Sequence, residues 1–238
     1  MSTFGGADIV KDGLVLALDA GSERSYPGSG TAWYDISGGG NTATLSAGIS
    51  YDNGYGGNFV FNGSGYIIND TVSSILNSDT FTIELDLLPT VDTYASGPGG
   101  RVIWSTHTSY SNRFMFIVSP TTGRIGCFTY SSYGGNLSVA NITTDDDAGK
   151  LGSEWKKVHF VRTTATNIDI YMNGVYNAYH TVPDYTDINQ FSLGQEWDSS
   201  NPSDYYYGKQ GPLKIYDRVL TQAEITQNYN AQKTRFGL

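Results

Sequence analysis

Cysteine, basic side chains and long apolar runs are all scarce in this sequence. A single cysteine, Cys127, stands among 238 residues, so no intrachain disulfide can form and cysteine-rich metal sites are excluded. The longest aliphatic run, Leu14–Leu18, has five residues and is far too short to span a membrane. The N-terminus lacks a basic segment followed by an apolar one, so we expect no secretory signal.

Charge is low and acidic. Charged residues make up 16% of the chain, and 14 Lys and Arg against 23 Asp and Glu leave a net charge of −9. Non-specific nucleic-acid binding requires a basic surface, and only Lys156 and Lys157 are adjacent basic residues. Nucleic acid is therefore excluded as a partner. The 18 Tyr, 10 Phe and 4 Trp supply apolar surface for a packed core and argue against disorder.

Most of the chain has the pattern of β-strands. Phe81–Leu87 alternates strictly between apolar and polar residues, as a strand does. Asn173-Gly174 separates two alternating runs, which predicts a hairpin with a type I′ turn, because both turn residues must take positive φ. Three further strands are predicted at Arg113–Val118, Arg124–Thr129 and Trp155–Arg162.

One helix is predicted, at residues 221–233. Thr221 and Glu224 form a capping box, and Leu220 and Ile225 flank it as a hydrophobic staple. We find no repeat and no linker, so residues 1–238 are predicted to be a single domain with an N-terminal arm at residues 1–12. Many short strands, glycine-rich turns and one helix indicate an all-β fold: a two-sheet antiparallel jelly-roll sandwich with a short C-terminal helix covering one end.

Five segments, in order, resemble the concanavalin A-like lectin/glucanase superfamily in its laminin-G-like form. The first and last, from Gly13 and up to Leu238, are similar to versions found in tailed-bacteriophage virion proteins. The resemblance implies the same sandwich, but this fold hosts lectins, hydrolases and purely structural proteins. The segments are GLVLALDAGSERSYPGSGTAWYDISGGGNTATL, NFVFNGSGYI, FTIELDLLPT, WKKVHFVRTTATNIDIYMNGV and LKIYDRVLTQAEITQNYNAQKTRFGL.

The resemblance also raises the question of catalysis at Glu84 and Asp86. Retaining glucanases of this superfamily carry a Glu, an Asp and a second Glu at alternate positions of one strand. Here Leu88 stands where the second Glu, the proton donor, is required. We therefore predict that the protein is not an enzyme and that Glu84 and Asp86 lie on a solvated sheet face.

Calcium is the only cofactor that the resemblance suggests. Asp19 and Asp35 are its candidate ligands, because calcium prefers carboxylate and carbonyl oxygens. Many laminin-G-like relatives carry an Asp before the last strand, where this chain has Gln210-Gly211-Pro212 instead. The run Asp145-Asp146-Asp147 is interpreted as solvated. His159 is interpreted as structural, and Cys127 as a small buried hydrophobe.

Sugar binding requires an aromatic platform with polar groups beside it, because pyranose rings have apolar faces and polar edges. Two loop regions supply both kinds of residue. The alternative is that these aromatics pack under their own loops or against another subunit. The candidate ligand-binding residues are Trp104, His107, Trp197, Tyr205 and Tyr206.

Two functions remain open. The first is a bacteriophage virion structural protein, a capsid decoration or tail accessory protein made in the host cytoplasm, whose partners are other virion proteins or copies of itself. The alternative is a carbohydrate-binding module that attaches to cell-surface glycans. Neither function requires a membrane-inserted segment.

Overall fold

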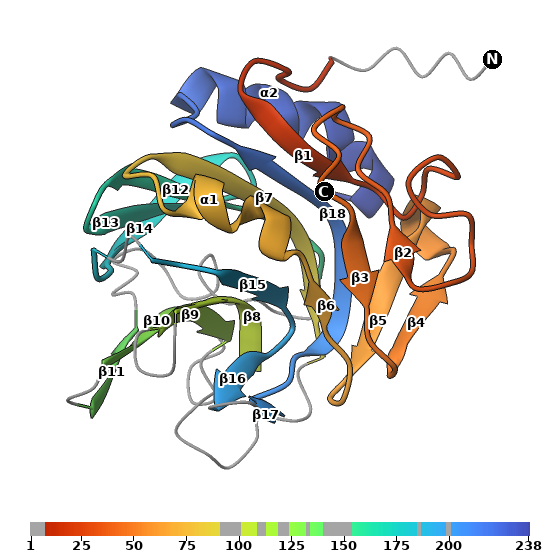
Figure 1. Ribbon diagram of the computed structural model, residues 1–238. Helices are drawn as coiled ribbons and strands as arrows, with labels where there is room; N and C mark the ends of the chain where they lie inside the picture. Colours follow the sequence, from red (N-terminus) through yellow and green to blue (C-terminus); the bar gives the residue numbers. More distant parts are fainter. Residues whose placement is uncertain are drawn as a thin grey trace.

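The computed structural model describes residues 8–90, 101–108, 113–118, 124–131, 134–139, 154–184, 187–198 and 201–238. Two antiparallel eight-stranded sheets pack face to face in this part of the chain, and a C-terminal helix lies outside them (Figure 1). This confirms the predicted fold class. The residues 119–123 between two of the predicted strands and the run Asp145-Asp146-Asp147 lie outside the described residues.

The first sheet has the order β14-β13-β12-β7-β18-β5-β4, with β1 also paired to β18. Its central strand, β7, is the alternating segment that the sequence predicts. The bounds are β1 Leu14–Leu18, β4 Ile49–Asp52, β5 Asn58–Asn62, β7 Phe81–Pro89, β12 Lys156–Thr164, β13 Asn167–Met172, β14 Val175–Thr181 and β18 Tyr207–Tyr216.

The second sheet has the order β11-β10-β9-β8-β15-β6-β3-β2. A separate two-stranded hairpin, β16 with β17, follows β15 along the chain. The bounds are β2 Ala32–Trp33, β3 Ala43–Leu45, β6 Ile67–Ile68, β8 Arg101–His107, β9 Arg113–Val118, β10 Ile125–Ser131, β11 Gly134–Val139, β15 Gln190–Leu193, β16 Glu196–Asp198 and β17 Asn201–Ser203.

The core lies between the two sheets and is rich in aromatic rings. One face of β7, with Ile83 and Leu85, is fully buried there. From the opposite sheet, the Trp104 ring packs against Phe116 and Phe160, with centroid distances of 4.9 and 5.3 Å. Short helical segments close the connections: η1 Gly54–Gly56, η2 Asp70–Val72, α1 Ser73–Leu76 and η3 Lys233–Phe236.

Two local predictions are confirmed. Asn173 and Gly174 join β13 to β14 with φ angles of 51° and 82°, the positive values that a type I′ turn needs. Helix α2 runs from Gln222 to Gln232, and Thr221 and Glu224 form the capping box at its N-terminus. Described helices are all too short and polar to cross a membrane.

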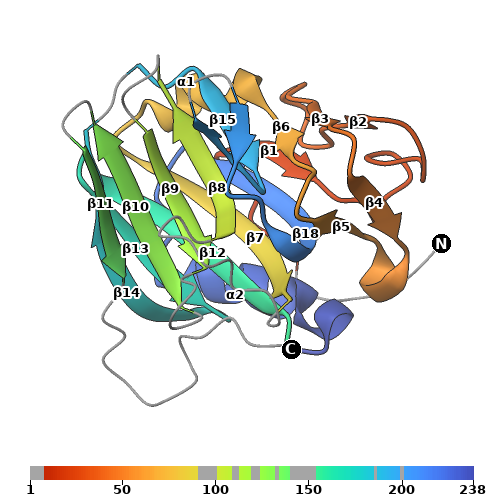
Figure 2. The same ribbon diagram turned by 90° about the horizontal axis from the view of Figure 1, so that it is seen from below.

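The position of α2 differs from the prediction. It lies across the outer face of the first sheet rather than over one end of the sandwich (Figure 2). Ile225 of the helix packs there against Val161 and Tyr216, whose side chains point away from the main core. Part of the predicted N-terminal arm joins this contact, because the Val10 amide donates to Asn228 Oδ1 at 2.8 Å. The sandwich therefore has a third layer on one side.

Candidate functional site

Glu84 and Asp86 are fully buried, so the expectation of a solvated sheet face is wrong. Both side chains point away from the main core, as the alternation predicts, but α2 covers that face. Lys157 Nζ lies 2.9 Å from Glu84 Oε1 and 2.7 Å from Asp86 Oδ2. Lys214 Nζ donates to the same Glu84 oxygen at 2.7 Å. Two lysines thus balance two carboxylates between the sheet and the helix.

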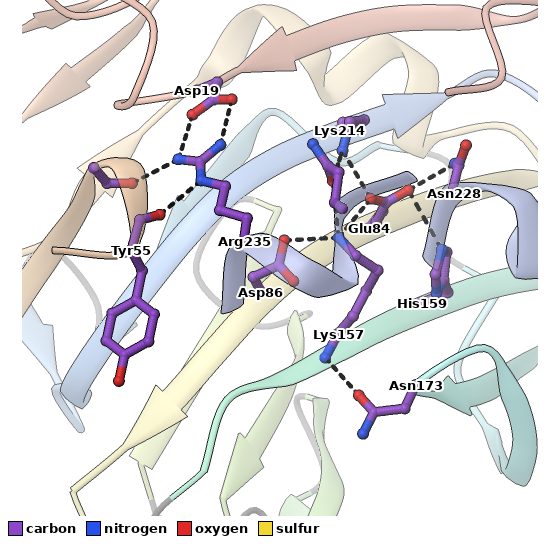
Figure 3. Close-up of polar contacts among 12 residues, drawn as sticks. Asp19, Tyr55, Glu84, Asp86, Lys157, His159, Asn173, Lys214, Asn228 and Arg235 are labelled. Carbon is purple, nitrogen blue, oxygen red and sulfur yellow. Dashed lines mark hydrogen bonds and ion pairs between the residues drawn. The ribbon is translucent and has the colours of Figure 1, made fainter. Parts of the chain in front are cut away.

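The helix completes this buried cluster with neutral polar groups (Figure 3). Gln232 Oε1 accepts from Lys157 Nζ at 3.0 Å and from Lys214 Nζ at 2.7 Å. Asn228 Nδ2 donates to Glu84 Oε2 at 2.7 Å, and His159 Nε2 lies 3.3 Å from that oxygen. We call Glu84, Asp86, Lys157, Lys214, His159, Asn228 and Gln232 the charge cluster.

The charge cluster pairs buried carboxylates with buried ammonium groups. Burial raises the pKa of Glu84, but the charges of Lys157 and Lys214 outweigh burial and hold this pKa well below its ordinary value. Burial lowers the pKa of Lys157, but the charges of Asp86 and Glu84 outweigh burial and raise this pKa above its ordinary value. The ammonium therefore stays charged. Burial raises the pKa of Asp86, but this carboxyl is fully buried and paired with Lys157, whereas a catalytic acid must reach a substrate. The cluster instead ties α2 to the sheet.

A partly exposed aromatic cluster lies at the β16–β17 hairpin. Trp197 of β16 contacts Tyr66 edge to face, with 5.7 Å between ring centroids and an interplanar angle of 69°. Tyr205 stacks against the same Tyr66 ring, with 6.5 Å between centroids and an interplanar angle of 27°. All three side chains are partly exposed. We call Tyr66, Trp197 and Tyr205 the aromatic platform.

The loops around the aromatic platform are held in place by specific contacts. The Arg101 guanidinium lies 3.8 Å from the centre of the Tyr207 ring. Gly63 takes a φ of +83°, and a Cβ there would come within 1.8 Å of that ring, so the turn between β5 and β6 requires glycine. Ser203 Oγ lies 3.2 Å from Glu196 Oε1 and 3.0 Å from Asp198 Oδ2 and fastens the hairpin.

The five candidate ligand-binding residues of the sequence divide into three groups. Trp197 and Tyr205 belong to the aromatic platform. Trp104 and Tyr206 are fully buried in the core, which corrects their assignment to a ligand-binding surface, because neither ring has a face open to solvent. His107 is buried at the end of β8, opposite Gln190 of β15.

Tyr66 is a platform residue that the sequence did not single out. It follows Gly65 and directly precedes β6, more than a hundred positions before Trp197. Its apolar neighbours Ile67 and Ile68 mark it only as the start of a short strand. Pairing of β15 with β6 brings the two regions together, and no local pattern encodes that pairing.

Asp19 and Asp35 do not fit a calcium site. Asp19 is paired with Arg235, whose Nη1 and Nη2 donate to its two carboxylate oxygens at 2.7 and 2.8 Å (Figure 3). The Asp35 carboxylate accepts from the backbone amides of Ala17, Ser37 and Asn41. Calcium needs six to eight oxygens, and both carboxylates are committed to donors. Within the described ranges, no group of three or more metal-binding side chains gathers.

The remaining predicted residues behave as structural elements. Cys127 is buried in the core, and burial raises the pKa of its thiol, which suits a small hydrophobe. His159 is fully buried within the charge cluster. Neither side chain meets solvent.

Comparison with models of protein families identifies the superfamily of this chain. Residues 61–226 match the concanavalin A-like lectin/glucanases superfamily, and the chain belongs to that superfamily. A search of curated protein sequences found no match.

Solved structures with the same fold include several binding domains. Domain 4 of AbnA, an extracellular GH43 arabinanase from Geobacillus stearothermophilus solved with arabinotriose, has a TM-score of 0.65 at 17% identity, over 91% of this chain and 98% of that one. The botulinum neurotoxin serotype D binding domain gives 0.68 at 14%, over 94% and 53%. The botulinum neurotoxin DC binding domain, solved with SialylT, gives 0.63 at 16%, over 93% and 52%. The chain spans about half the length of these toxin domains.

Proposed function

We propose that this domain is a non-catalytic carbohydrate-binding module and that the aromatic platform is its binding surface. The observation that carries the proposal is the partly exposed Tyr66 ring in contact with both Trp197 and Tyr205, which are also partly exposed. Aromatic rings cover the apolar face of a pyranose, and nearby polar side chains bond its hydroxyls. Asn62, Ser64 and Asp198 are exposed on the adjoining turns and supply such groups.

The solved relatives support this proposal at the level of the fold. One was solved with arabinotriose and another with SialylT. Each shares its fold over more than nine tenths of this chain. A lectin-like sandwich can therefore present a sugar site on its loops. In this chain the aromatic platform lies at the β16–β17 hairpin.

The burial of Glu84 and Asp86 supports a binding role without catalysis. On this strand the two carboxyls face α2 and are paired with Lys157 and Lys214. A substrate could reach them only after the helix had left the sheet. We propose on this ground that the domain holds its ligand and does not cleave it.

A glycan array probed with the purified protein, with and without calcium, tests the proposal. We expect binding to at least one glycan, unchanged by calcium, and an affinity loss of roughly 5- to 150-fold for Trp197→Ala, since removing an aromatic stacking face costs about 1–3 kcal/mol. Tyr34→Ala is the matched control, because Tyr34 is exposed but lies outside the platform. Equal losses in both variants, or no glycan bound, would reject the proposal.

A second candidate is a structural role in a bacteriophage virion, supported by the similarity of both chain ends to virion proteins. The exposed residues Val175, Tyr176 and Tyr179 on strand β14 favour it, since tyrosine is common at protein interfaces. Purification of phage particles from lysed cells tests it. We expect the chain to copurify with the virion, and its restriction to the soluble fraction would reject the role.

A further inference from the structure

Three tyrosines gather on the outer face of strands β13 and β14. The rings of Tyr171 and Tyr176 meet edge to face with 5.4 Å between centroids. Tyr179 lies further along β14, opposite Asp169, and is 61% exposed, while Tyr176 is 47% exposed. These rings form an open aromatic surface that is separate from the aromatic platform.

A carboxylate lies among these rings. Asp169 of β13 is the direct cross-strand partner of Tyr179, so their side chains stand on the same face. Burial first, and then the charge of Asp169, raise the pKa of Tyr171 and of Tyr176, which places this carboxylate near both phenols. Its hydrogen-bond donor is Asn167 Nδ2 at 2.8 Å, a neutral group.

No lysine or arginine lies near Asp169 in the sequence to pair with its carboxylate. Between Arg162 and Lys209 the chain has no lysine or arginine. His180 of β14 is buried on the opposite face of the sheet, against Phe116. From the adjoining helix, Gln222 reaches this region and donates to the Gly174 carbonyl at 2.7 Å. The neighbours identified among the described residues, Asp169, Asn167 and Gln222, are therefore neutral or negative.

We propose that Tyr171, Tyr176, Tyr179 and Asp169 form a docking site for a protein partner that presents arginine or lysine side chains. A guanidinium or ammonium over a tyrosine face gains a cation–π contact, and a carboxylate beside the rings adds direct charge attraction. The docking site does not depend on glycan binding.

Charge complementarity selects a foreign basic partner over a second copy of this chain. Each copy carries a net charge of −9, so two copies repel one another at low salt. The same field attracts a basic surface and raises its rate of association. A partner of opposite charge then docks on the edge of β14, against its tyrosines.

Titration of the intact protein with an oligo-arginine peptide, followed by calorimetry and by NMR shifts of the tyrosines, tests the site. We expect salt-sensitive binding that an oligo-glutamate peptide does not show. Tyr179→Ala and Asp169→Asn should each weaken binding about threefold. Glu23→Gln is the charge-matched control, because Glu23 is exposed in the loop after β1, and this variant should leave binding unchanged.

Three results would overturn the proposal. Equal weakening in Glu23→Gln would show attraction by net charge alone. Absence of peptide binding at low salt would remove the site. Stable dimers in sedimentation experiments, broken by Tyr179→Ala, would assign the surface to a second copy. Circular dichroism of each variant shows whether it is folded. None of the three results bears on the proposed glycan binding through Trp197.

Discussion

Asn228 of helix α2 donates a hydrogen bond of 2.7 Å to Glu84, a residue 144 positions earlier in the centre of the first sheet. The amide also donates to the Tyr216 hydroxyl and accepts from the Val10 backbone. One side chain thus connects the helix, two strands and the N-terminal segment. The outer face of the sheet is closed by polar contacts as well as by apolar packing.

Removal of one lysine from the charge cluster should be costly. We expect Lys157→Met to lower the free energy of unfolding by about 3–5 kcal/mol, because it leaves Glu84 and Asp86 buried without their shared cation. Lys156→Met is the control, since Lys156 pairs with the exposed Glu154. It should cost less than about 1 kcal/mol. Urea unfolding measures both, and similar costs would contradict the role of the cluster.

Acid should weaken the attachment of α2. The pKa of Glu84 is held well below 4.5, so the folded state keeps this carboxylate ionised after the unfolded chain has taken up a proton. Its contribution is full above about pH 4.5 and is lost as the pH falls through the folded pKa. Asp86 acts in the opposite sense, because burial raises its pKa.

The comparison of wild type with Glu84→Gln isolates the Glu84 contribution. The variant is less stable at neutral pH, because its amide cannot balance Lys157 and Lys214. We expect its unfolding free energy to fall less steeply than that of the wild type below about pH 4.5. Parallel pH profiles in urea unfolding would contradict the prediction.

His180 should produce a separate pH dependence at higher pH. Burial lowers its pKa from 6.5 to about 4, so the folded state binds fewer protons than the unfolded chain between these values. Stability is full above pH 6.5 and declines toward pH 4, by about 3 kcal/mol in total. His180→Leu should flatten this part of the profile. An unchanged slope in the variant would rule out His180 as its source.

Gly63 should be required for the shape of the loop beside the aromatic platform. Gly63→Ala adds a Cβ against the Tyr207 ring at a positive φ, whereas Gly28→Ala meets the same backbone strain with open space around it. We expect Gly28→Ala to cost about 1 kcal/mol. Gly63→Ala should cost about 1–3 kcal/mol more and weaken glycan binding. Equal costs would show that the contact with Tyr207 is not needed.

Much of the fold was predictable, because it rests on local patterns. The alternation in Phe81–Leu87 identified the two faces of β7 correctly. It did not show what covers the polar face, and Glu84 and Asp86 were placed in solvent for that reason. The aromatic platform was half predictable: Trp197 and Tyr205 lie close together in sequence, but Tyr66 reaches them only through the sheet.

Backbone preferences and residue periodicity were enough to predict strand β7, the Asn173-Gly174 hairpin and the start of α2. These features depend on residues within a few positions of each other. The tertiary structure decided where α2 docks, and therefore that two lysines and two carboxylates share a buried site. It also decided which aromatics remain exposed, because burial depends on what packs against a side chain from distant parts of the chain.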